Sequence, residues 1–157
     1  MIEVEVPGRG TLRLEQLLLD LNGTIALDGA LLDGVAERLQ ALTGQLEIRV
    51  ASADTYGRLG AIAAELGVAA ARLRAGESEA EEKAAIVRAL GAERVVAIGN
   101  GVNDAAMLRE AALGVAVLGC EGLAVVALQA ADLVVPSIGD ALDLLLNPRR
   151  LRASLRT

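Results

Sequence analysis

The sequence predicts an α/β protein, a three-layer α/β/α sandwich in which helices cover both faces of a parallel sheet. Short β-type runs alternate with helical stretches along the whole chain. The run at residues 16–19 is apolar without alternation, as expected of a strand buried on both faces, and residues 46–51 are expected to form the second buried strand. With 157 residues, 54% of them apolar, the chain can bury the core of one such domain and is too apolar to be disordered.

Local signals place the elements along the chain. The turn residues Pro7-Gly8-Arg9-Gly10 join two strands into an N-terminal hairpin. The first buried strand stops abruptly at Asp20, and the capping-box pattern Ser78-Glu79-Ala80-Glu81 opens a later helix. The predicted strands span residues 2–6, 11–14, 16–19, 46–51, 71–74, 95–98, 114–118 and 133–135, and the predicted helices span residues 32–42, 56–66, 78–90, 103–112, 123–130 and 138–146.

The domain organisation follows from the same alternation, which contains no linker, repeat or low-complexity segment. We expect a single domain over residues 1–157. It comprises an N-terminal hairpin at 1–15, a core at 16–147 and an Arg-rich C-terminal tail at 148–157.

The composition excludes several kinds of chemistry. There is no histidine, one cysteine (Cys120), one tyrosine and no other aromatic residue. Ser/His/Asp triads, His- or Cys-rich metal sites and base-stacking platforms are therefore excluded. The net charge of −6 gives no electrostatic footprint for a nucleic-acid partner. Of the 15 basic residues, 14 are arginines and Lys83 is the only lysine.

Residues 111–131 resemble a membrane span because Glu121 is their only charge. Three glycines divide the stretch, and the charge lies in its middle, so a buried strand, a turn and a helix are the better interpretation. The charged start Met1-Ile2-Glu3-Val4-Glu5 does not match a signal peptide. We expect a cytoplasmic protein with no membrane partner.

Polar clusters follow the predicted strands, and in a parallel α/β sheet the functional site lies at the carboxyl ends of the strands. Lys83 lies near the start of the helix between the second and third clusters. The clusters are Asp20-Leu21-Asn22-Gly23-Thr24, Ser52-Ala53-Asp54-Thr55 and Gly99-Asn100-Gly101-Val102-Asn103-Asp104. A dinucleotide fingerprint fails because Asp104 stands where its third glycine would be.

These motifs, in this order, resemble the haloacid dehalogenase (HAD) superfamily. They are most similar to a soluble, stand-alone form of the P-type ATPase phosphorylation domain, and the resemblance runs from residue 16 to 146. It implies a HAD-type Rossmann-like sheet and a Mg²⁺-dependent phosphohydrolase that forms an aspartyl phosphate on Asp20. Only 32 positions separate Asp20 from Ser52 and 31 separate Ser52 from Lys83, so no cap domain is expected.

The resemblance also implies the roles of individual residues. Gly23 and Thr24 would turn the backbone so that amides face the phosphoryl oxygens, Ser52 would donate its hydroxyl, and Lys83 would neutralise charge. The implied catalytic residues are Asp20, Asn22, Ser52 and Lys83; the phosphate-binding residues are Leu21, Gly23, Thr24, Ser52, Ala53 and Lys83; the Mg²⁺ ligands are Asp20, Asn22, Asn100 and Asp104; and the supporting residues are Asp54 and Asn103.

Each role has a structural alternative. Asp20 would cap a turn, Ser52 would make a local turn hydrogen bond, and Lys83 would pair with Glu79 at the surface. Asp104 would complement a helix dipole and Asn103 would be an N-cap. The use of arginine everywhere except at Lys83 favours a functional role for this compact ammonium group.

Two residues depart from the common phosphatase pattern of the superfamily. Asn22 stands where a general acid/base Asp is usual, and Asn100 also replaces an Asp. Because Asn cannot transfer protons, we expect slow turnover. The alternative is a weak or inactive phosphoryl-binding or regulatory module. The expected partners are a phosphorylated substrate of unknown identity and further copies of the chain in a dimer or tetramer. The hairpin would either pair between subunits or simply protect an edge.

Overall fold

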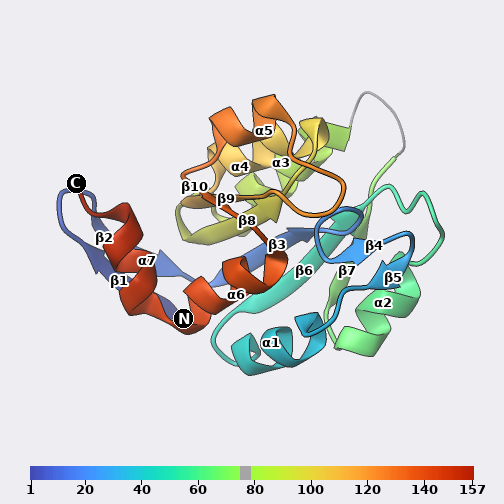
Figure 1. Cartoon of the computed structure of the whole chain (residues 1–157), viewed down its shortest axis with the longest axis horizontal. Helices are drawn as coiled ribbons and strands as arrows, with labels where there is room; N and C mark the ends of the chain where they lie inside the picture. The colour runs from blue at the N-terminus through green and yellow to red at the C-terminus, as the bar shows by residue number, and fades with distance from the viewer. Residues whose placement is uncertain (75–78) are drawn as a thin grey trace.

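A computed structural model describes residues 1–74 and 79–157, and its centre is a six-stranded, fully parallel sheet (Figure 1). The strand order is β10-β9-β8-β3-β6-β7. The strands are β3 (Gln16–Asp20), β6 (Glu47–Ser52), β7 (Ala69–Arg72), β8 (Val95–Gly99), β9 (Leu113–Val117) and β10 (Leu133–Val135). The register pairs Asp20 with Ala51 and Leu19 with Ile98, so the ends of β3, β6 and β8 meet at the centre of one edge.

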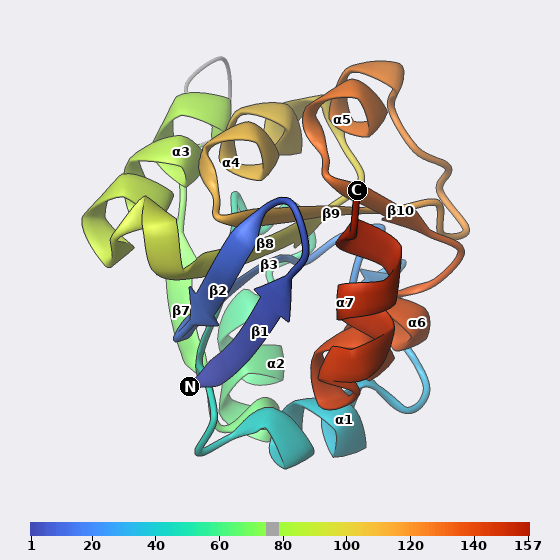
Figure 2. The same ribbon diagram turned by 90° about the vertical axis from the view of Figure 1, so that its left-hand side faces the viewer.

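Helices cover both faces of this sheet, which confirms the predicted three layers (Figures 1 and 2). On one face lie α3 (Glu79–Leu90), α4 (Ala105–Glu110) and α5 (Val125–Ala130), and on the other lie α1 (Val35–Leu42), α2 (Leu59–Leu66) and α6 (Ile138–Leu146). In the central strand, Leu17 and Leu19 belong to one apolar cluster and Leu18 belongs to the cluster on the opposite face. Alternate side chains of the strand therefore pack into the two layers.

A lobe at one end of the molecule, on the left in Figure 1 and nearest the viewer in Figure 2, combines the two ends of the chain. The predicted hairpin is present as β1 (Ile2–Val6) and β2 (Gly10–Leu14). The residues expected to form an Arg-rich tail instead form helix α7 (Pro148–Leu155), which begins with a proline at its first position. Leu151 and Leu155, one turn apart, are buried, so this amphipathic helix packs its apolar face against the lobe.

Several predicted boundaries are wrong, and tertiary contacts explain the largest shifts. Helix α1 begins at Val35 rather than at residue 32, because a short hairpin of β4 (Ala26–Leu27) and β5 (Ala30–Leu31) precedes it and Gly34 has a left-handed backbone. Helix α2 begins at Leu59 rather than at residue 56, where the Asp54 side chain accepts a hydrogen bond from the Leu59 amide. Ser78 lies outside the described residues, so its capping box stays a prediction.

The apolar stretch 111–131 forms a strand, a loop and a helix, as expected: β9, residues 118–124 and α5. Elsewhere the predicted helix 103–112 is divided into a 3₁₀ turn (Val102–Asp104) and α4. Across residues 1–74 and 79–157, no helix has both the length and the apolar character needed to cross a membrane.

Candidate active site

The polar residues at the ends of β3, β6 and β8 surround a cavity of about 230 Å³. Asp20 is the last residue of β3 and Ser52 the last of β6, and Lys83 reaches the cavity from α3. The predicted site residues that line the cavity are Asp20, Asn22, Ser52, Ala53, Lys83, Asn100 and Asn103. Thr24 and Asp104 lie behind this lining and contact it through hydrogen bonds, whereas Asp54 does not line the cavity.

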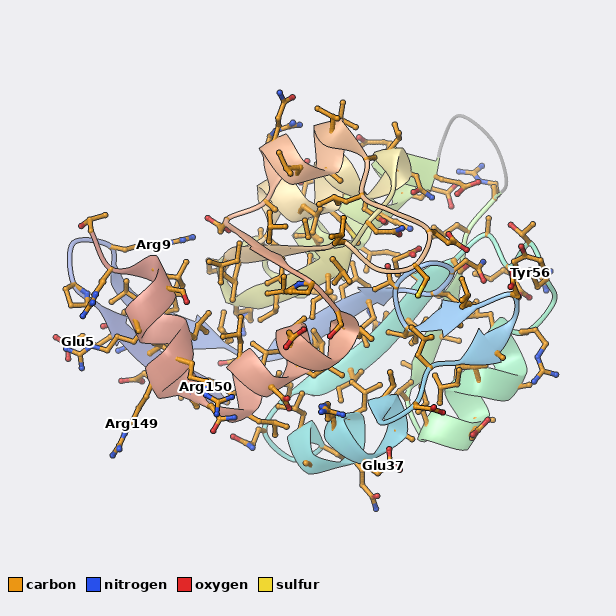
Figure 3. The ribbon with its side chains drawn as sticks, in the orientation of Figure 1. Glu5, Arg9, Glu37, Tyr56, Arg149 and Arg150 are labelled. Atoms are coloured by element: carbon orange, nitrogen blue, oxygen red, sulfur yellow. The ribbon has the colours of Figure 1, made fainter. Side chains whose placement is uncertain are left out.

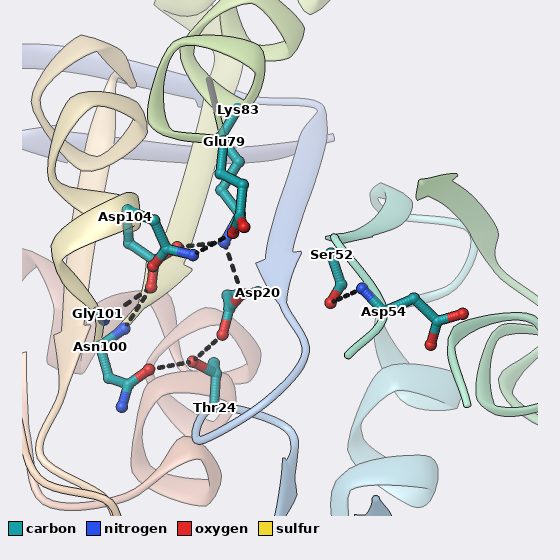
Figure 4. Close-up of polar contacts among 10 residues, drawn as sticks. Asp20, Thr24, Ser52, Asp54, Glu79, Lys83, Asn100, Gly101 and Asp104 are labelled. Atoms are coloured by element: carbon teal, nitrogen blue, oxygen red, sulfur yellow. Dashed lines mark hydrogen bonds and ion pairs between the residues drawn. The ribbon is translucent and has the colours of Figure 1, made fainter. Parts of the chain in front are cut away.

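Lys83 bridges two carboxylates at the centre of the site (Figure 4). Its side chain is fully buried, and its Nζ lies 2.6 Å from Asp20 Oδ1 and 2.6 Å from Asp104 Oδ1. The alternative of a surface pair with Glu79 is therefore wrong. A compact ammonium group fits between two converging oxygens, where the planar fork of an arginine would need a different arrangement.

The electrostatics of this trio leave the site short of positive charge. Burial, reinforced by the nearby Asp104 carboxylate, raises the pKa of Asp20 to about 7, although Lys83 and Thr24 act in the opposite direction. Burial alone would lower the pKa of Lys83, but Asp20 and Asp104 together raise it above its usual value, so the ammonium stays charged. Two buried carboxylates then share one cation, an environment that favours binding of a further cation.

Asp104 closes the turn that follows β8. Its Oδ2 accepts hydrogen bonds from the amides of Asn100 (2.9 Å) and Gly101 (2.8 Å), while Oδ1 accepts from Lys83. Gly99 is required here, because a Cβ at that position would lie 2.5 Å from the Asp104 carboxyl carbon. The Asp104 carboxylate therefore does two things at once: it binds backbone amides where the helix starts, and it pairs with Lys83.

Amide and hydroxyl oxygens complete the donor set. Thr24 Oγ1 lies within hydrogen-bond distance of Asp20 Oδ2 (3.1 Å) and Asn100 Oδ1 (3.3 Å). Asn100 Nδ2 donates to Gly122 O (3.1 Å), which turns the Asn100 oxygen towards Thr24 (Figure 4). Among the described residues, Asn22 Oδ1 is the buried side-chain polar atom that lacks a hydrogen-bond partner. Carboxylate and amide oxygens with unmet negative charge fit Mg²⁺, which binds through one or two carboxylates.

The backbone amides differ from the expectation for the loop after Asp20. The Gly23 amide donates to Ala26 O (2.8 Å) and the Thr24 amide to Leu21 O (3.4 Å), so neither is free to face a phosphoryl group. The turn uses both amides for its own closure, so the phosphate-binding roles of Gly23 and Thr24 stay predictions that this geometry does not support. Within the described part of the chain, the amides of Asn22 and Ala53 make no hydrogen bond outside the strand ladders and are available to an anion, whereas the Leu21 amide follows the last residue of β3 that pairs with β6.

The residues after β6 divide into two roles. Ser52 Oγ accepts a hydrogen bond from the Asp54 amide (3.0 Å), so the local turn bond exists, yet the hydroxyl proton is still available for donation. Asp54 Oδ1 accepts from the Leu59 amide (2.7 Å), and its carboxylate points away from Asp20 (Figure 4). Asp54 thus holds the start of α2. On the other side, Asn103 Nδ2 donates to Glu79 Oε2 (2.9 Å).

Sequence reasoning missed four lining residues, Thr55, Glu79, Gly101 and Glu121, although Thr55 and Gly101 belong to the polar clusters after β6 and β8. Glu79 lies one helical turn before Lys83, a spacing that had suggested an ion pair rather than a second lining residue. Glu121 carried a signal, because it is the only charge in the apolar stretch 111–131. Thr55 had none beyond its place after Ser52.

A parallel sheet with a buried Asp–Lys–Asp trio at the carboxyl ends of its central strands defines a capless, Rossmann-like α/β hydrolase. The haloacid dehalogenase-like hydrolase family matches residues 2–112, and the chain belongs to this family. An uncharacterized protein of Methanocaldococcus jannaschii is 48% identical over 64 residues, which are 41% of this chain and 69% of the relative. A second protein of that organism is 59% identical over 39 residues, 25% of this chain and 89% of the relative.

Solved structures share the fold. The cobalt-bound deoxy-D-mannose-octulosonate 8-phosphate phosphatase of Haemophilus influenzae superposes with a TM-score of 0.71 at 14% identity, covering 88% of this chain and 90% of that one. The corresponding Moraxella catarrhalis phosphatase, solved with magnesium, phosphate and KDO, gives 0.66 at 18% identity and covers 90% of each chain. The catalytic domain of the CPx-ATPase CopB-B gives 0.61 at 27% identity over 74% of this chain and 46% of that one, so the chain spans about half of that structure.

Proposed function

We propose that this HAD-family hydrolase is a Mg²⁺-dependent phosphohydrolase that works through an aspartyl phosphate on Asp20. The observation that carries the proposal is the position of Asp20, which ends the central strand, lines the cavity and lies 2.6 Å from the buried Lys83 ammonium. The Mg²⁺-bound and phosphate-bound state of the Moraxella catarrhalis phosphatase, which shares the fold, supports the cofactor and the substrate class.

In the proposed reaction, a carboxylate oxygen of Asp20 attacks phosphorus in line, and the bond from phosphorus to the leaving oxygen breaks. Lys83, the Ser52 hydroxyl and the free amide of Ala53 hold the phosphoryl oxygens, which carry more negative charge in the transition state. A water molecule then attacks the phosphorus of phospho-Asp20, so that phosphate leaves and the Asp20 carboxylate returns.

The residues that would hold Mg²⁺ are Asp20 through its carboxylate, Asn22 through its backbone carbonyl and Asn100 through Oδ1. Both oxygens of Asp104 are already engaged by Lys83 and two amides, so Asp104 contributes mainly its charge and the position of Asn100. When bound, the metal neutralises phosphate charge and orients the phosphoryl group.

Slow turnover is part of the proposal. Asn22 cannot donate a proton to the leaving oxygen or accept one from the attacking water, and such proton transfer contributes about 10²–10⁴-fold to rate. Solvent would supply this proton, since no cap encloses the cavity.

The test compares wild type with Asp20→Asn in Mg²⁺, using a chromogenic aryl phosphate and radiolabelled phosphate trapping by acid quench. We expect Asp20→Asn to abolish hydrolysis and labelling. Asp33→Asn, an exposed carboxylate outside the site, is the matched control and should retain both. Equal rates for wild type and Asp20→Asn at every Mg²⁺ concentration would contradict the proposal.

The Asn22→Asp variant distinguishes two hypotheses. One is a slow enzyme, and the other is an inactive phosphoryl-binding module, which the presence of Asn22 and Asn100 favours. We expect the variant to raise kcat by about 10²-fold, because a carboxylate at this position restores general acid/base catalysis. Unchanged or lower turnover would remove Asn22 from the acid/base position. Phosphate binding without turnover in both proteins would support the binding module.

A further inference from the structure

Glu121 places a second carboxylate at the cavity that contains Asp20. It lines the cavity, although it lies about one hundred positions further along the chain in the loop after β9. A Cβ added to Gly23 would lie 2.4 Å from Glu121 Oε2 and 3.0 Å from its carboxyl carbon. The Glu121 carboxylate therefore lies directly against the backbone of the loop that follows Asp20.

Backbone contacts hold this loop on both sides of Glu121. Before it, the amides of Leu118 and Gly119 donate to the carbonyls of Val135 (3.0 Å) and Pro136 (3.2 Å). After it, Gly122 O accepts from Asn100 Nδ2 (3.1 Å), and the Ala124 amide donates to Asn100 O (2.9 Å). Asn100 belongs to the proposed metal site. Its contacts with Gly122 and Ala124 therefore hold the Glu121 loop in place relative to that site.

The charge of Glu121 is not neutralised by the described residues, with which it forms no hydrogen bond or ion pair. The described residues that line the cavity include the carboxylates of Asp20, Glu79 and Glu121 but one cation, Lys83, which Asp20 and Asp104 already share. A substrate with a second anionic group would meet repulsion here, whereas a substrate with a cationic group would find an unpaired carboxylate.

The size of the cavity limits where that cationic group can be. Small-molecule sites usually have volumes of about 300–1,000 Å³. At about 230 Å³, this cavity has room for a phosphoryl group and a few further atoms. An ammonium group two or three bonds from the phosphate oxygen would therefore stay within reach of the rim.

We infer that Glu121 is a specificity residue that selects small phosphomonoesters bearing a protonated amine, the phosphates of amino alcohols, over those bearing a carboxylate. This inference rests on the proposed phosphohydrolase site, in which Lys83 and Ser52 hold the phosphoryl end while Glu121 accepts hydrogen bonds from the ammonium. The expected preference differs from that of the Haemophilus influenzae and Moraxella catarrhalis phosphatases, which are named for an octulosonate 8-phosphate, itself an acid.

The experiment is isothermal titration calorimetry of the whole chain in Mg²⁺ with three probes of similar size: phosphoethanolamine, ethylene glycol monophosphate and phosphoglycolate. Wild type should bind the amine about tenfold more tightly than the neutral probe, the value expected of one charge-assisted hydrogen bond, and the carboxylate most weakly. Glu121→Gln should remove most of the amine preference. Glu121→Asp should keep part of it, and Glu65→Gln, an exposed carboxylate outside the cavity, should keep all of it.

Equal affinity of wild type for the amine and neutral probes would overturn the inference, as would an amine preference that persists in a folded Glu121→Gln protein. Failure of the amine probe to bind would also overturn it. Binding is measured whether or not the probes are hydrolysed, so the two proposals can fail separately. If the preference for the amine probe depends on Glu121 but hydrolysis does not depend on Asp20, this inference is supported and the proposed reaction is contradicted.

Discussion

At the carboxyl ends of its central strands the molecule buries charge, whereas the lobe formed by β1, β2 and α7 buries only apolar side chains. The buried polar and charged side chains of the described residues all follow strands β3, β6 and β8 or reach their ends: Asp20, Thr24, Ser52, Asp54, Lys83, Asn100 and Asp104. The buried side chains of the lobe are Ile2, Val4, Val6, Leu14, Leu151 and Leu155. The same short chain therefore uses two opposite kinds of interior.

The difference separates what stabilises the fold from what the site requires. Apolar burial contributes about 25 cal/mol per Å², while burial of ions carries a desolvation penalty that pairing only partly offsets. Lys83 is fully buried, whereas the arginines in ion pairs keep between 31% (Arg9) and 85% (Arg74) of their side chains exposed. Buried charge at one end of the sheet is thus maintained at the expense of stability, which is what a reactive site needs.

Replacing the buried cation, Lys83, should have the largest effect on both activity and stability. Lys83→Met should lower Asp20-dependent hydrolysis by about 10²–10³-fold, because the phosphoryl oxygens lose a charged donor. It should also destabilise the protein by up to about 3–5 kcal/mol, since two buried carboxylates lose their partner. Steady-state kinetics and urea unfolding measure the two effects.

Two variants control this prediction. Lys83→Arg keeps the charge and should nevertheless lose activity to a similar extent, because a planar guanidinium does not fit between Asp20 and Asp104. Arg88→Met removes an exposed cation of the same helix and should change stability by less than about 1 kcal/mol. Full activity of Lys83→Met would mean that the lysine serves the fold alone.

The lobe offers the converse test. Leu151→Ala removes a fully buried side chain of α7 and should lower the free energy of unfolding by about 2–5 kcal/mol. Because the lobe lies at the far end from the cavity, kcat/KM per folded molecule should not change. Arg149→Ala is the control on the same helix, since Figure 3 shows Arg149 pointing away from the molecule. Loss of activity in folded Leu151→Ala would couple the lobe to the site.

The smallest expected effect is a pH dependence of magnesium stabilisation. The pKa of Asp20 is raised from 3.8 to about 7 in the folded protein. Protonated Asp20 therefore contributes to the free energy of unfolding fully below pH 3.8, and this contribution is lost as the pH rises through 7. Mg²⁺ needs the ionised carboxylate, so it should raise Tm more at pH 8 than at pH 6. For a chain of this size, about 1 kcal/mol corresponds to 2–4 °C.

Thermal unfolding with and without Mg²⁺ measures this difference. Asp20→Asn should lose the pH dependence between pH 6 and 8, because the titrating group is gone. A magnesium shift that is equal at both pH values in wild type would show that Asp20 is ionised throughout this range or does not bind the metal.

Local pattern predicted the sheet well, because strands such as 16–19 and 95–98 are apolar on both faces and need no distant contact to be recognised. It failed where a boundary depends on tertiary contacts. The start of α2 follows from the Asp54 cap, and helix α7 becomes apparent only when Leu151 and Leu155 have the hairpin to pack against. The single-domain boundaries and the dimer or tetramer remain predictions.

The site divides in the same way. By itself the sequence determined the alternation of strands and helices, the polar clusters at strand ends and the uniqueness of Lys83, because these are properties of neighbouring residues. The tertiary structure alone decided that Lys83 lies between Asp20 and Asp104, that the Gly23 and Thr24 amides are used within their turn, and that Glu121 reaches the cavity. The physical reason is that charge pairing and amide availability depend on distances between segments far apart in the chain, which the parallel sheet sets when it brings the strand ends together.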